Sequence, residues 1–418
     1  MKKKTLSCAD LQHSLFAAPN ELRHCCQRFF VDGKMKGDVA IFDVSSNEDI
    51  SVNRILESKK KLIQQINNGE DNPCSGCPLI KKDHWEPLDK LTIKYLSVEP
   101  HSVCNLKCSY CSPIYYGGEK PTYDVLDLYD KLKEKDAFSK RISIVWGGGE
   151  PILLRSFDKV FTTLTSNLKP FYNNIFTNAT FFNQTINKYL INGMVAITTS
   201  IDAGTKETYE IVRGKYRLHR VLANLKKYAE HGADNITIKY ILLAENLSDE
   251  EVLAFVRLIK EFELTGCSFQ ISTDYKNESI MNDVIDAAML MHEKLKFIGA
   301  NFISFDEHIR GRISKKMKTK SYNKNKFSNI IIWGASEYAE TLLRNSHFFK
   351  QNSISYFVDS NKDIVGKKIN NYDIKSTEHV LFNDYPIFIG TAIFYREIFK
   401  ELMSMGVDKD RIIEHILV

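Results

Sequence analysis

Three closely spaced cysteines are the residues of this 418-residue chain best suited to chemistry. They lie in the run Cys104-Asn-Leu-Lys-Cys108-Ser-Tyr-Cys111. Clusters of four irons usually take four cysteine thiolates. Three sulfurs in one short loop can hold such a cluster and leave one iron open, so that a substrate or cofactor completes its coordination. The alternative is a zinc knuckle, which needs a fourth cysteine or histidine nearby, and His101 is awkwardly close to Cys104.

A glycine-rich turn follows the cysteine loop by about forty residues, in Trp146-Gly147-Gly148-Gly149-Glu150-Pro151. Glycine lets the backbone approach a ligand closely. By itself such a turn is weak support for a binding site. Together with the cysteine loop it indicates a single cofactor site built from two loops.

The Cys-x3-Cys-x2-Cys spacing, with the aromatic Tyr110 just before the last cysteine, resembles that of the radical S-adenosylmethionine (SAM) enzymes. The resemblance implies a [4Fe-4S] cluster on Cys104, Cys108 and Cys111, with SAM on the fourth iron. Reductive cleavage of SAM would then give a 5′-deoxyadenosyl radical that abstracts hydrogen from a substrate. The resemblance also implies flavodoxin or ferredoxin as the electron donor.

The same resemblance assigns further residues to SAM. Glu150 and the glycine turn would receive its ammonium group, Ser200 and Asp202 would bind ribose hydroxyls or help place the methionine, and Asn178 matches a third-strand Thr-Asn segment. Arg213 would meet the carboxylate, because its fork donates two hydrogen bonds, although a surface residue at a turn is the alternative. No catalytic residue is identified. The implied cofactor-binding residues are Tyr110, Gly147, Gly148, Gly149, Glu150, Asn178, Ser200, Asp202 and Arg213.

Between residues 93 and 296, short β-branched runs alternate with amphipathic stretches, which predicts parallel strands joined by helices. Barrel active sites lie after the carboxyl ends of such strands, where the cysteine loop, Glu150, Asn178 and Asp202 all fall. Gly232 is expected to cap a helix over 217–231, and Ser248 to open the next with a capping box. The expected strands are 93–98, 142–146, 174–176, 195–200, 237–242 and 268–272, and the expected helices are 123–135, 153–168, 181–191, 217–231, 248–262 and 278–297.

The other cysteines ahead of the barrel are Cys8, the pair Cys25-Cys26, and Cys74-x2-Cys77. This stretch resembles a single-cluster SPASM-type auxiliary domain, although such domains usually follow the barrel. The resemblance implies an auxiliary [4Fe-4S] cluster on Cys8, Cys26, Cys74 and Cys77, with Cys25 as the alternative to Cys26. Structural zinc on four cysteines is the competing interpretation.

The C-terminal segment begins as strand, turn and helix over 329–339, and a second strand over 353–358 ends at Asp359. This order is typical of a Rossmann fold, with Asp359 suited to a ribose. Ser336 replaces the second glycine of the fingerprint, which weakens any prediction of pyrophosphate binding. The region resembles small modules attached to sugar-nucleotide acetyltransferases and sugar methyltransferases, which suggests a nucleotide-linked sugar. A domain that only packs or dimerises is equally compatible.

The predicted fold class is therefore α/β: a partial (β/α)6 TIM-type barrel with an N-terminal Cys-rich cluster domain and a C-terminal Rossmann-like domain. The expected boundaries are 1–90 for the auxiliary domain, 91–309 for the barrel, 310–326 for a basic linker and 327–418 for the last domain. A nucleic-acid contact through the linker is less expected, because that needs a basic face on a folded surface.

Composition supports a globular protein, with 43% hydrophobic and 26% charged residues and a net charge of only +5. No apolar run approaches the roughly 20 residues of a membrane helix, and no signal peptide is evident. We therefore expect a cytoplasmic protein without membrane contact. In that setting nine cysteines favour metal ligation over disulfides.

The sequence leads to a radical SAM enzyme acting on a small molecule, a carbohydrate or nucleotide-linked sugar, by oxidation, epimerisation or dehydration. One alternative keeps the chemistry but matures a peptide. Another, of a different class, is a non-catalytic iron–sulfur or zinc protein that senses redox state or binds nucleic acid. Oligomeric state and product are not predicted.

Overall fold

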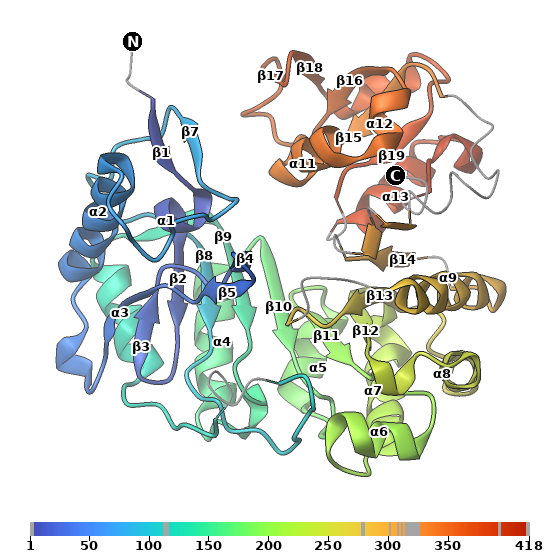
Figure 1. Ribbon diagram of the computed structural model, residues 1–418, viewed down its shortest axis with the longest axis horizontal. Helices are drawn as coiled ribbons and strands as arrows, with labels where there is room; N and C mark the ends of the chain where they lie inside the picture. The colour runs from blue at the N-terminus through green and yellow to red at the C-terminus, as the bar shows by residue number, and fades with distance from the viewer. Residues whose placement is uncertain are drawn as a thin grey trace. The chain divides into compact units, whose positions relative to one another are not determined.

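The computed structural model describes residues 4–111, 117–276, 281–300, 302–306, 309–310, 312–313, 327–391 and 394–414. Contacts divide the chain into two compact units (Figure 1). Unit 1 comprises Met1–Ile238 with Asp274–Ser279, and unit 2 comprises Lys239–Thr273 with Ile280–Val418. The fold is α/β and contains a partial TIM-like barrel. Most of the predicted basic linker, 310–326, falls outside the described residues.

Four parallel strands of unit 1 carry the predicted barrel loops. They are β8 (Ile93–Val98), β9 (Phe138–Trp146), β10 (Tyr172–Phe176) and β11 (Ala196–Ser200), hydrogen-bonded in that order. The N-terminal segment extends the same sheet, because β2 (Ser14–Ala17) pairs in parallel with β8. Two antiparallel strands continue it, β3 (Glu21–Arg23) and β6 (Ala40–Asp43).

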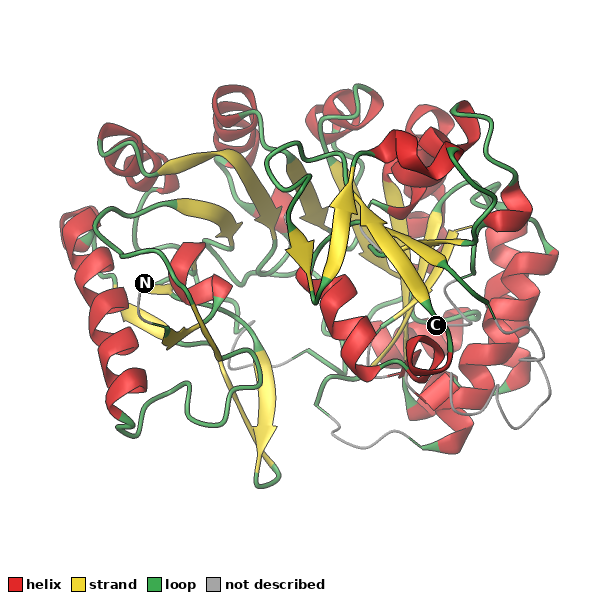
Figure 2. Ribbon diagram, turned by 90° about the horizontal axis from the view of Figure 1, so that it is seen from above, coloured by secondary structure: helices red, strands yellow, loops and turns green. Residues whose placement is uncertain are grey.

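Helices cover one face of these strands (Figure 2). Successive strand residues point to opposite faces, and Trp146 of β9 turns toward α4 (Phe157–Leu168), where its ring lies 5.2 Å from that of Phe161. The Trp146 indole N–H donates to Asn173 Oδ1 at 2.8 Å. The remaining helices of this series are α3 (Val125–Glu134), α5 (Gln184–Ile191), α6 (Lys206–Arg213) and α7 (Leu218–Gly232).

The N-terminal segment has further elements, and its five cysteines lie in the stretches between them. The longest is α2 (Val52–Asn68), which begins with Ser51 accepting from the backbone N–H of Arg54 and ends at Gly69 in the left-handed region. The others are β1 (Thr5–Ser7), α1 (Ala9–His13), β4 (Arg28–Val31), β5 (Lys34–Gly37) and β7 (Lys81–Asp83).

Unit 2 begins within β12 (Ile236–Leu242) and continues through α8 (Asp249–Glu261), β13 (Ser268–Thr273), α9 (Asn282–Phe297) and β14 (Phe302–Phe305). Strands β13 and β14 are parallel neighbours. Ser248 caps α8 as expected, by accepting from the Glu251 backbone N–H at 3.2 Å.

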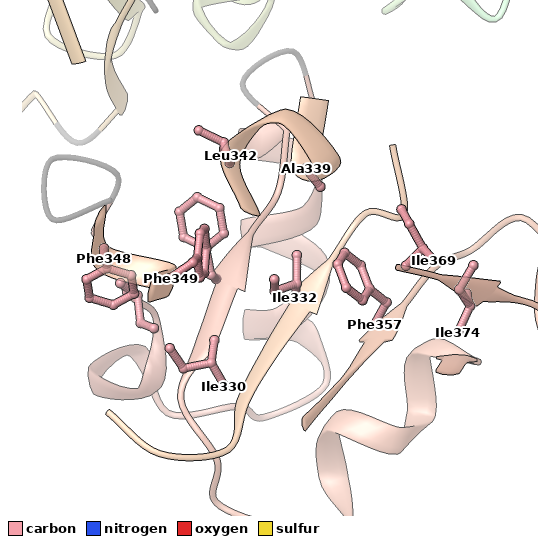
Figure 3. Close-up of a cluster of buried hydrophobic side chains, with 11 residues drawn as sticks. Ile330, Ile332, Ala339, Leu342, Phe348, Phe349, Phe357, Ile369 and Ile374 are labelled. Carbon is pink, nitrogen blue, oxygen red and sulfur yellow. The ribbon is translucent and has the colours of Figure 1, made fainter. Parts of the chain in front are cut away.

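The C-terminal part of unit 2 is a five-stranded sheet in the order β17-β18-β16-β15-β19. Alternate residues of β15 face opposite sides: Ile330 and Ile332 join one buried cluster (Figure 3), and Ile331 and Trp333 join another. The elements are β15 (Ile330–Trp333), α11 (Glu337–Asn345), α12 (His347–Gln351), β16 (Ile354–Val358), β17 (Lys368–Ile369), β18 (Tyr372–Lys375), β19 (Ile387–Ile389) and α13 (Tyr395–Ser404).

All six predicted barrel strands form, but the cap predicted at Gly232 is wrong. Gly232 is the last residue of α7, and Ala233 is the C-cap, in right-handed conformation. A Cβ at Gly232 would lie 2.8 Å from the Leu190 side chain. Glycine is therefore required there by the close approach of α5, and not by a left-handed turn.

Within the described residues, no helix is both long and apolar enough to cross a membrane.

Candidate active site

The cysteine loop is anchored by its backbone at two places. Lys107 N–H donates to Arg213 C=O at 3.1 Å and Ser109 N–H to Val212 C=O at 2.8 Å, so the loop satisfies carbonyls at the end of α6. On its other side, Val103 C=O accepts from the Glu150 N–H at 2.9 Å. Backbone hydrogen bonds thus hold the cysteine loop in place on both sides.

The glycine turn packs against that loop. A Cβ at Gly149 would lie 2.0 Å from Val103 O, and one at Gly148 would lie 2.4 Å from His101 O. Gly148 also has a positive φ of 89°, whereas a Cβ at Gly147 would meet nothing closer than 3.6 Å. Gly148 and Gly149 must therefore be glycine because the cysteine loop lies so close to them. The predicted contact of this turn with a ligand stays a prediction.

Glu150 is buried and bridges two loops. Its carboxylate accepts from Thr177 Oγ1 at 2.7 Å and from the Asn178 backbone N–H at 2.6 Å. Burial raises the pKa of Glu150 to about 7. These hydrogen bonds and the positive charge of Arg213 act in the opposite direction and lower the pKa. The carboxylate thus binds the loop after β10, and its contact with an ammonium group stays a prediction.

Asn178 connects this carboxylate to Cys104, the first cysteine of the loop. Its side-chain amide donates to Cys104 Sγ at 3.6 Å and to Asn105 Oδ1 at 2.8 Å, while its own Oδ1 accepts from Thr180. Asn105 in turn donates to Thr180 Oγ1 at 2.7 Å. The sequence offered no signal for Asn105 or Thr180, because single polar residues in loops are common.

Asp202, Arg213 and Tyr110 meet in a buried group. Arg213 Nη1 lies 2.8 Å from Asp202 Oδ2, the Tyr110 hydroxyl donates to the same oxygen at 2.8 Å, and Arg213 also contacts that hydroxyl. Arg213 is 4% exposed, which excludes the surface alternative. Three residues assigned separately to a cofactor therefore bind one another. Ser200, the last residue of β11, lies two positions before Asp202.

The three thiols differ in exposure: Cys104 is exposed, and Cys108 and Cys111 are partly buried. Burial raises the pKa of Cys111 to about 11, the neighbouring Cys108 and Cys104 add to it, and the cations Arg213 and Lys276 oppose it. Lys276 Nζ donates to Cys111 C=O at 3.3 Å. Sulfur donors with adjacent cations fit an anionic iron–sulfur cluster, whose ligands must be thiolates.

A second cysteine group lies in the N-terminal segment. Cys8 caps α1, with Leu11 N–H donating to its Sγ at 3.4 Å, and it packs with Cys25 and Cys74 in an apolar cluster. Burial raises the pKa of Cys8 to about 11, and Asp10, Cys25 and Cys77 add to it. The structure thus brings together Cys8, Cys25, Cys74 and Cys77, which we call the N-terminal cysteine group.

Cys26, the predicted ligand, is the chain neighbour of Cys25. Burial raises the pKa of Cys26, and the charged groups acting on it are Glu99, Asp38, Arg28 and Asp10. Cys25 packs in the apolar cluster with Cys8 and Cys74, which supports Cys25, the alternative, and the choice between the two stays a prediction. Adjacent side chains of an extended chain point in opposite directions. The spacing of the cysteines in the sequence could not show whether Cys25 or Cys26 points toward the other cysteines.

All nine cysteines lie in the described part of the chain, and none forms a disulfide. Among the described residues, no three His, Cys, Asp or Glu side chains are placed to hold a single metal ion. Both cysteine groups as metal sites therefore remain predictions.

The C-terminal turn uses its acidic residue internally. Asp359 Oδ2 accepts from the Ala335 N–H at 2.8 Å, and Oδ1 accepts from the Asn361 N–H at 2.8 Å. Ser336 Oγ caps α11 by accepting from Ala339 N–H, and it donates to Gly390 C=O at 3.2 Å. The polar groups predicted for a nucleotide thus already have partners within the turn.

Comparison with known proteins identifies the class of the first site. Residues 98–259, which contain the cysteine loop, the glycine turn, Asn178, Asp202 and Arg213, match the Radical SAM superfamily. This segment is therefore a radical SAM domain. Residues 326–413 match a family described as C2185-like, N-terminal.

Among individual proteins, the chain is similar to GTP 3′,8-cyclases. It is 22% identical over 205 residues to that of Mannheimia succiniciproducens, covering 48% of this chain and 60% of the relative. It is 26% identical over 172 residues to that of Vibrio vulnificus, covering 40% and 50%. The chain thus spans about half the length of the curated relatives it matches.

Solved structures show more distant likenesses. Native anSMEcpe with bound AdoMet is 17% identical, with a TM-score of 0.38 over 56% of this chain and 68% of that one. Streptococcus suis SuiB bound to precursor peptide SuiA is 14% identical, with a TM-score of 0.43 over 86% and 82%.

Proposed function

We propose that this protein is a cytoplasmic radical SAM enzyme that holds a [4Fe-4S] cluster on Cys104, Cys108 and Cys111. The observation that carries the proposal is the match of residues 98–259 to the superfamily, with the three cysteines inside it. When bound, the cluster and SAM supply the one-electron reduction and the radical that abstracts hydrogen. A flavodoxin or ferredoxin is the proposed source of the electron.

The residues of the chain prepare that site. The carbonyls ending α6 and the glycine turn fix the cysteine loop from two sides. Asn178 donates to Cys104, and Glu150 holds Asn178 in place. Such a rigid arrangement supplies the orientation that a short-lived radical requires.

Asp202, Arg213 and Tyr110 position the loop in this proposal. Because Arg213 is buried and Asp202 neutralises it, this pair ties Tyr110, beside Cys111, to the end of β11. Ser200 and the glycine turn are further proposed contacts to SAM.

We propose a nucleotide-linked sugar as the substrate class. The related GTP 3′,8-cyclases are named for a nucleotide, and GTP shares with a nucleotide-linked sugar its base, ribose and phosphates. Oxidation, epimerisation and dehydration all begin with abstraction of hydrogen from such a sugar.

We further propose that the N-terminal cysteine group holds an auxiliary metal centre, an iron–sulfur cluster in the first instance. Its support is the convergence of four thiols from three separate stretches of sequence. Zinc on the same four sulfurs is the alternative, which iron and zinc analysis distinguishes.

Anaerobic reconstitution with iron and sulfide, followed by dithionite and SAM, tests the main proposal. The enzyme must release 5′-deoxyadenosine, which a redox sensor or nucleic-acid-binding protein would not do. For the substrate class, UDP-glucose and GTP should each be compared with a short cysteine-containing peptide. Stimulation of 5′-deoxyadenosine release by the peptide alone would contradict the sugar proposal.

A further inference from the structure

Lys59, in α2, is a fully buried lysine beside the N-terminal cysteine group. Its side chain is 0% exposed, and Nζ donates to Leu11 C=O at 3.0 Å and to Ser14 C=O at 2.8 Å. Burying an ammonium group is costly unless its charge is compensated. Both acceptors are neutral carbonyls, so the hydrogen bonds alone do not balance its charge.

The position of Lys59 on α2 places it on the face that covers the cysteines. Ile55, Lys59, Leu62 and Ile66 recur at helical spacing and are the buried residues of this helix. Leu62 and Ile66 belong to the apolar cluster that contains Cys8, Cys25 and Cys74. A cation is thus placed at the apolar wall of the cysteine group.

Leu11, the middle residue of α1, links Lys59 to Cys8. Cys8 Sγ accepts from the Leu11 N–H, and Lys59 Nζ donates to the Leu11 C=O. The groups whose charge acts on Lys59 are Asp10 and, when deprotonated, Cys8 and Cys25. Burial lowers the pKa of Lys59 to about 8, and these neighbours oppose that shift.

We infer that Lys59 is a positioning residue that supplies the buried counter-charge for a metal centre on Cys8, Cys25, Cys74 and Cys77. The inference rests on the auxiliary centre proposed above. Four thiolates around a dipositive metal core leave a net charge of about −2, which an apolar pocket does not stabilise. A neighbouring cation stabilises this charge, and it stabilises the reduced state, with one more negative charge, still further.

The charge of Lys59 is tested in the full chain with Cys104, Cys108 and Cys111 replaced by alanine, so that only the N-terminal group can bind a cluster. After anaerobic loading with iron and sulfide, its midpoint potential is measured by redox titration followed by electron paramagnetic resonance. Lys59→Met should lower the ratio of reduced to oxidised cluster at a fixed potential at least tenfold, or 59 mV for a one-electron couple. Lys59→Arg and the exposed control Lys60→Met should change it less than threefold.

An unchanged potential in Lys59→Met, with iron content and circular dichroism preserved, would overturn the inference. If Lys59→Met loses its iron while Lys59→Arg keeps it, the charge is required and the inference is supported. Equal loss in both variants would show that geometry matters and charge does not. If the protein with Lys59 intact binds no iron, both the auxiliary centre and this role are overturned. Release of 5′-deoxyadenosine by the unsubstituted chain tests the radical SAM proposal separately.

Discussion

The side-chain amide of Asn178 lies 3.6 Å from Cys104 Sγ and donates to it. Behind it, the buried Glu150 holds the Asn178 backbone N–H at 2.6 Å. The Glu150 carboxylate is therefore linked, through Asn178, to Cys104 in the cysteine loop. Hydrogen bonds to cluster sulfurs help to set reduction potentials.

Asn178→Ala should lower the midpoint potential of the cluster on Cys104, Cys108 and Cys111, because an N–H donor stabilises the more negative reduced state. One hydrogen bond to a charged group contributes about 1.5–3 kcal/mol. We expect the difference between oxidation states to be a fraction of that, roughly a few-fold in the ratio of reduced to oxidised cluster. Redox titration measures it, with the exposed Asn192→Ala as control. Equal potentials in the two variants would rule out this tuning role.

Removal of single cysteines should separate the two groups. Cys108→Ala should abolish SAM cleavage, because it removes one of three thiolates in the cysteine loop. Cys77→Ala should spare cleavage at least partly, since Cys77 belongs to the N-terminal cysteine group. The measurement is 5′-deoxyadenosine released per protein under dithionite. Full cleavage in both variants would show that the two metal sites are wrongly assigned.

The glycine turn offers a matched pair of substitutions. Gly149→Ala should displace the cysteine loop, because its Cβ would lie 2.0 Å from the backbone O of Val103. Gly147→Ala should be tolerated, because its nearest neighbour is the Glu99 side chain at 3.6 Å. Iron content after reconstitution should fall severalfold in the first variant and stay unchanged in the second. Full iron binding by Gly149→Ala would mean that the turn does not support the loop.

Glu150 should make stability depend on pH. Its pKa is about 7 in the folded protein against 4.5 for an ordinary glutamate, so between these values the folded state binds more protons than the unfolded state. The free energy of unfolding should therefore fall as pH rises from 4.5 to 7, by about 3 kcal/mol.

Denaturant unfolding of the metal-free protein between pH 5 and pH 8 measures this dependence. Glu150→Gln should remove it, since an amide does not titrate and can still accept from Asn178 and donate to Thr177. The exposed Glu210→Gln should retain it. A Glu150→Gln profile parallel to that of the unsubstituted protein would contradict the assignment.

Sequence patterns predicted the barrel strands well because buried parallel strands are continuous apolar runs of β-branched residues. The expected strand 93–98 coincides with β8. Helix α6 was not expected, since its eight residues are mostly polar and only Tyr209, Val212 and Arg213 are buried. Yet the carbonyls of its last turn hold the cysteine loop.

The pairing of the candidate site residues was not predicted. The family resemblance assigned Asp202, Arg213 and Tyr110 to one cofactor, but it could not show that a buried cation would be neutralised by the nearest carboxylate. The choice between Cys25 and Cys26 likewise depends on the direction of each side chain. Sequence patterns can predict the loop on which a residue lies. Which residue it contacts depends on the tertiary structure.

The carboxylate of Asp359 accepts the Ala335 N–H in the turn after β15. An incoming phosphate would compete for the same donor against an anion already seated there, and would be repelled by it. A diphosphate could enter this turn only after that carboxylate moves away. Asp359 thus occupies, with its own charge, the backbone donor that a phosphate would need in this turn.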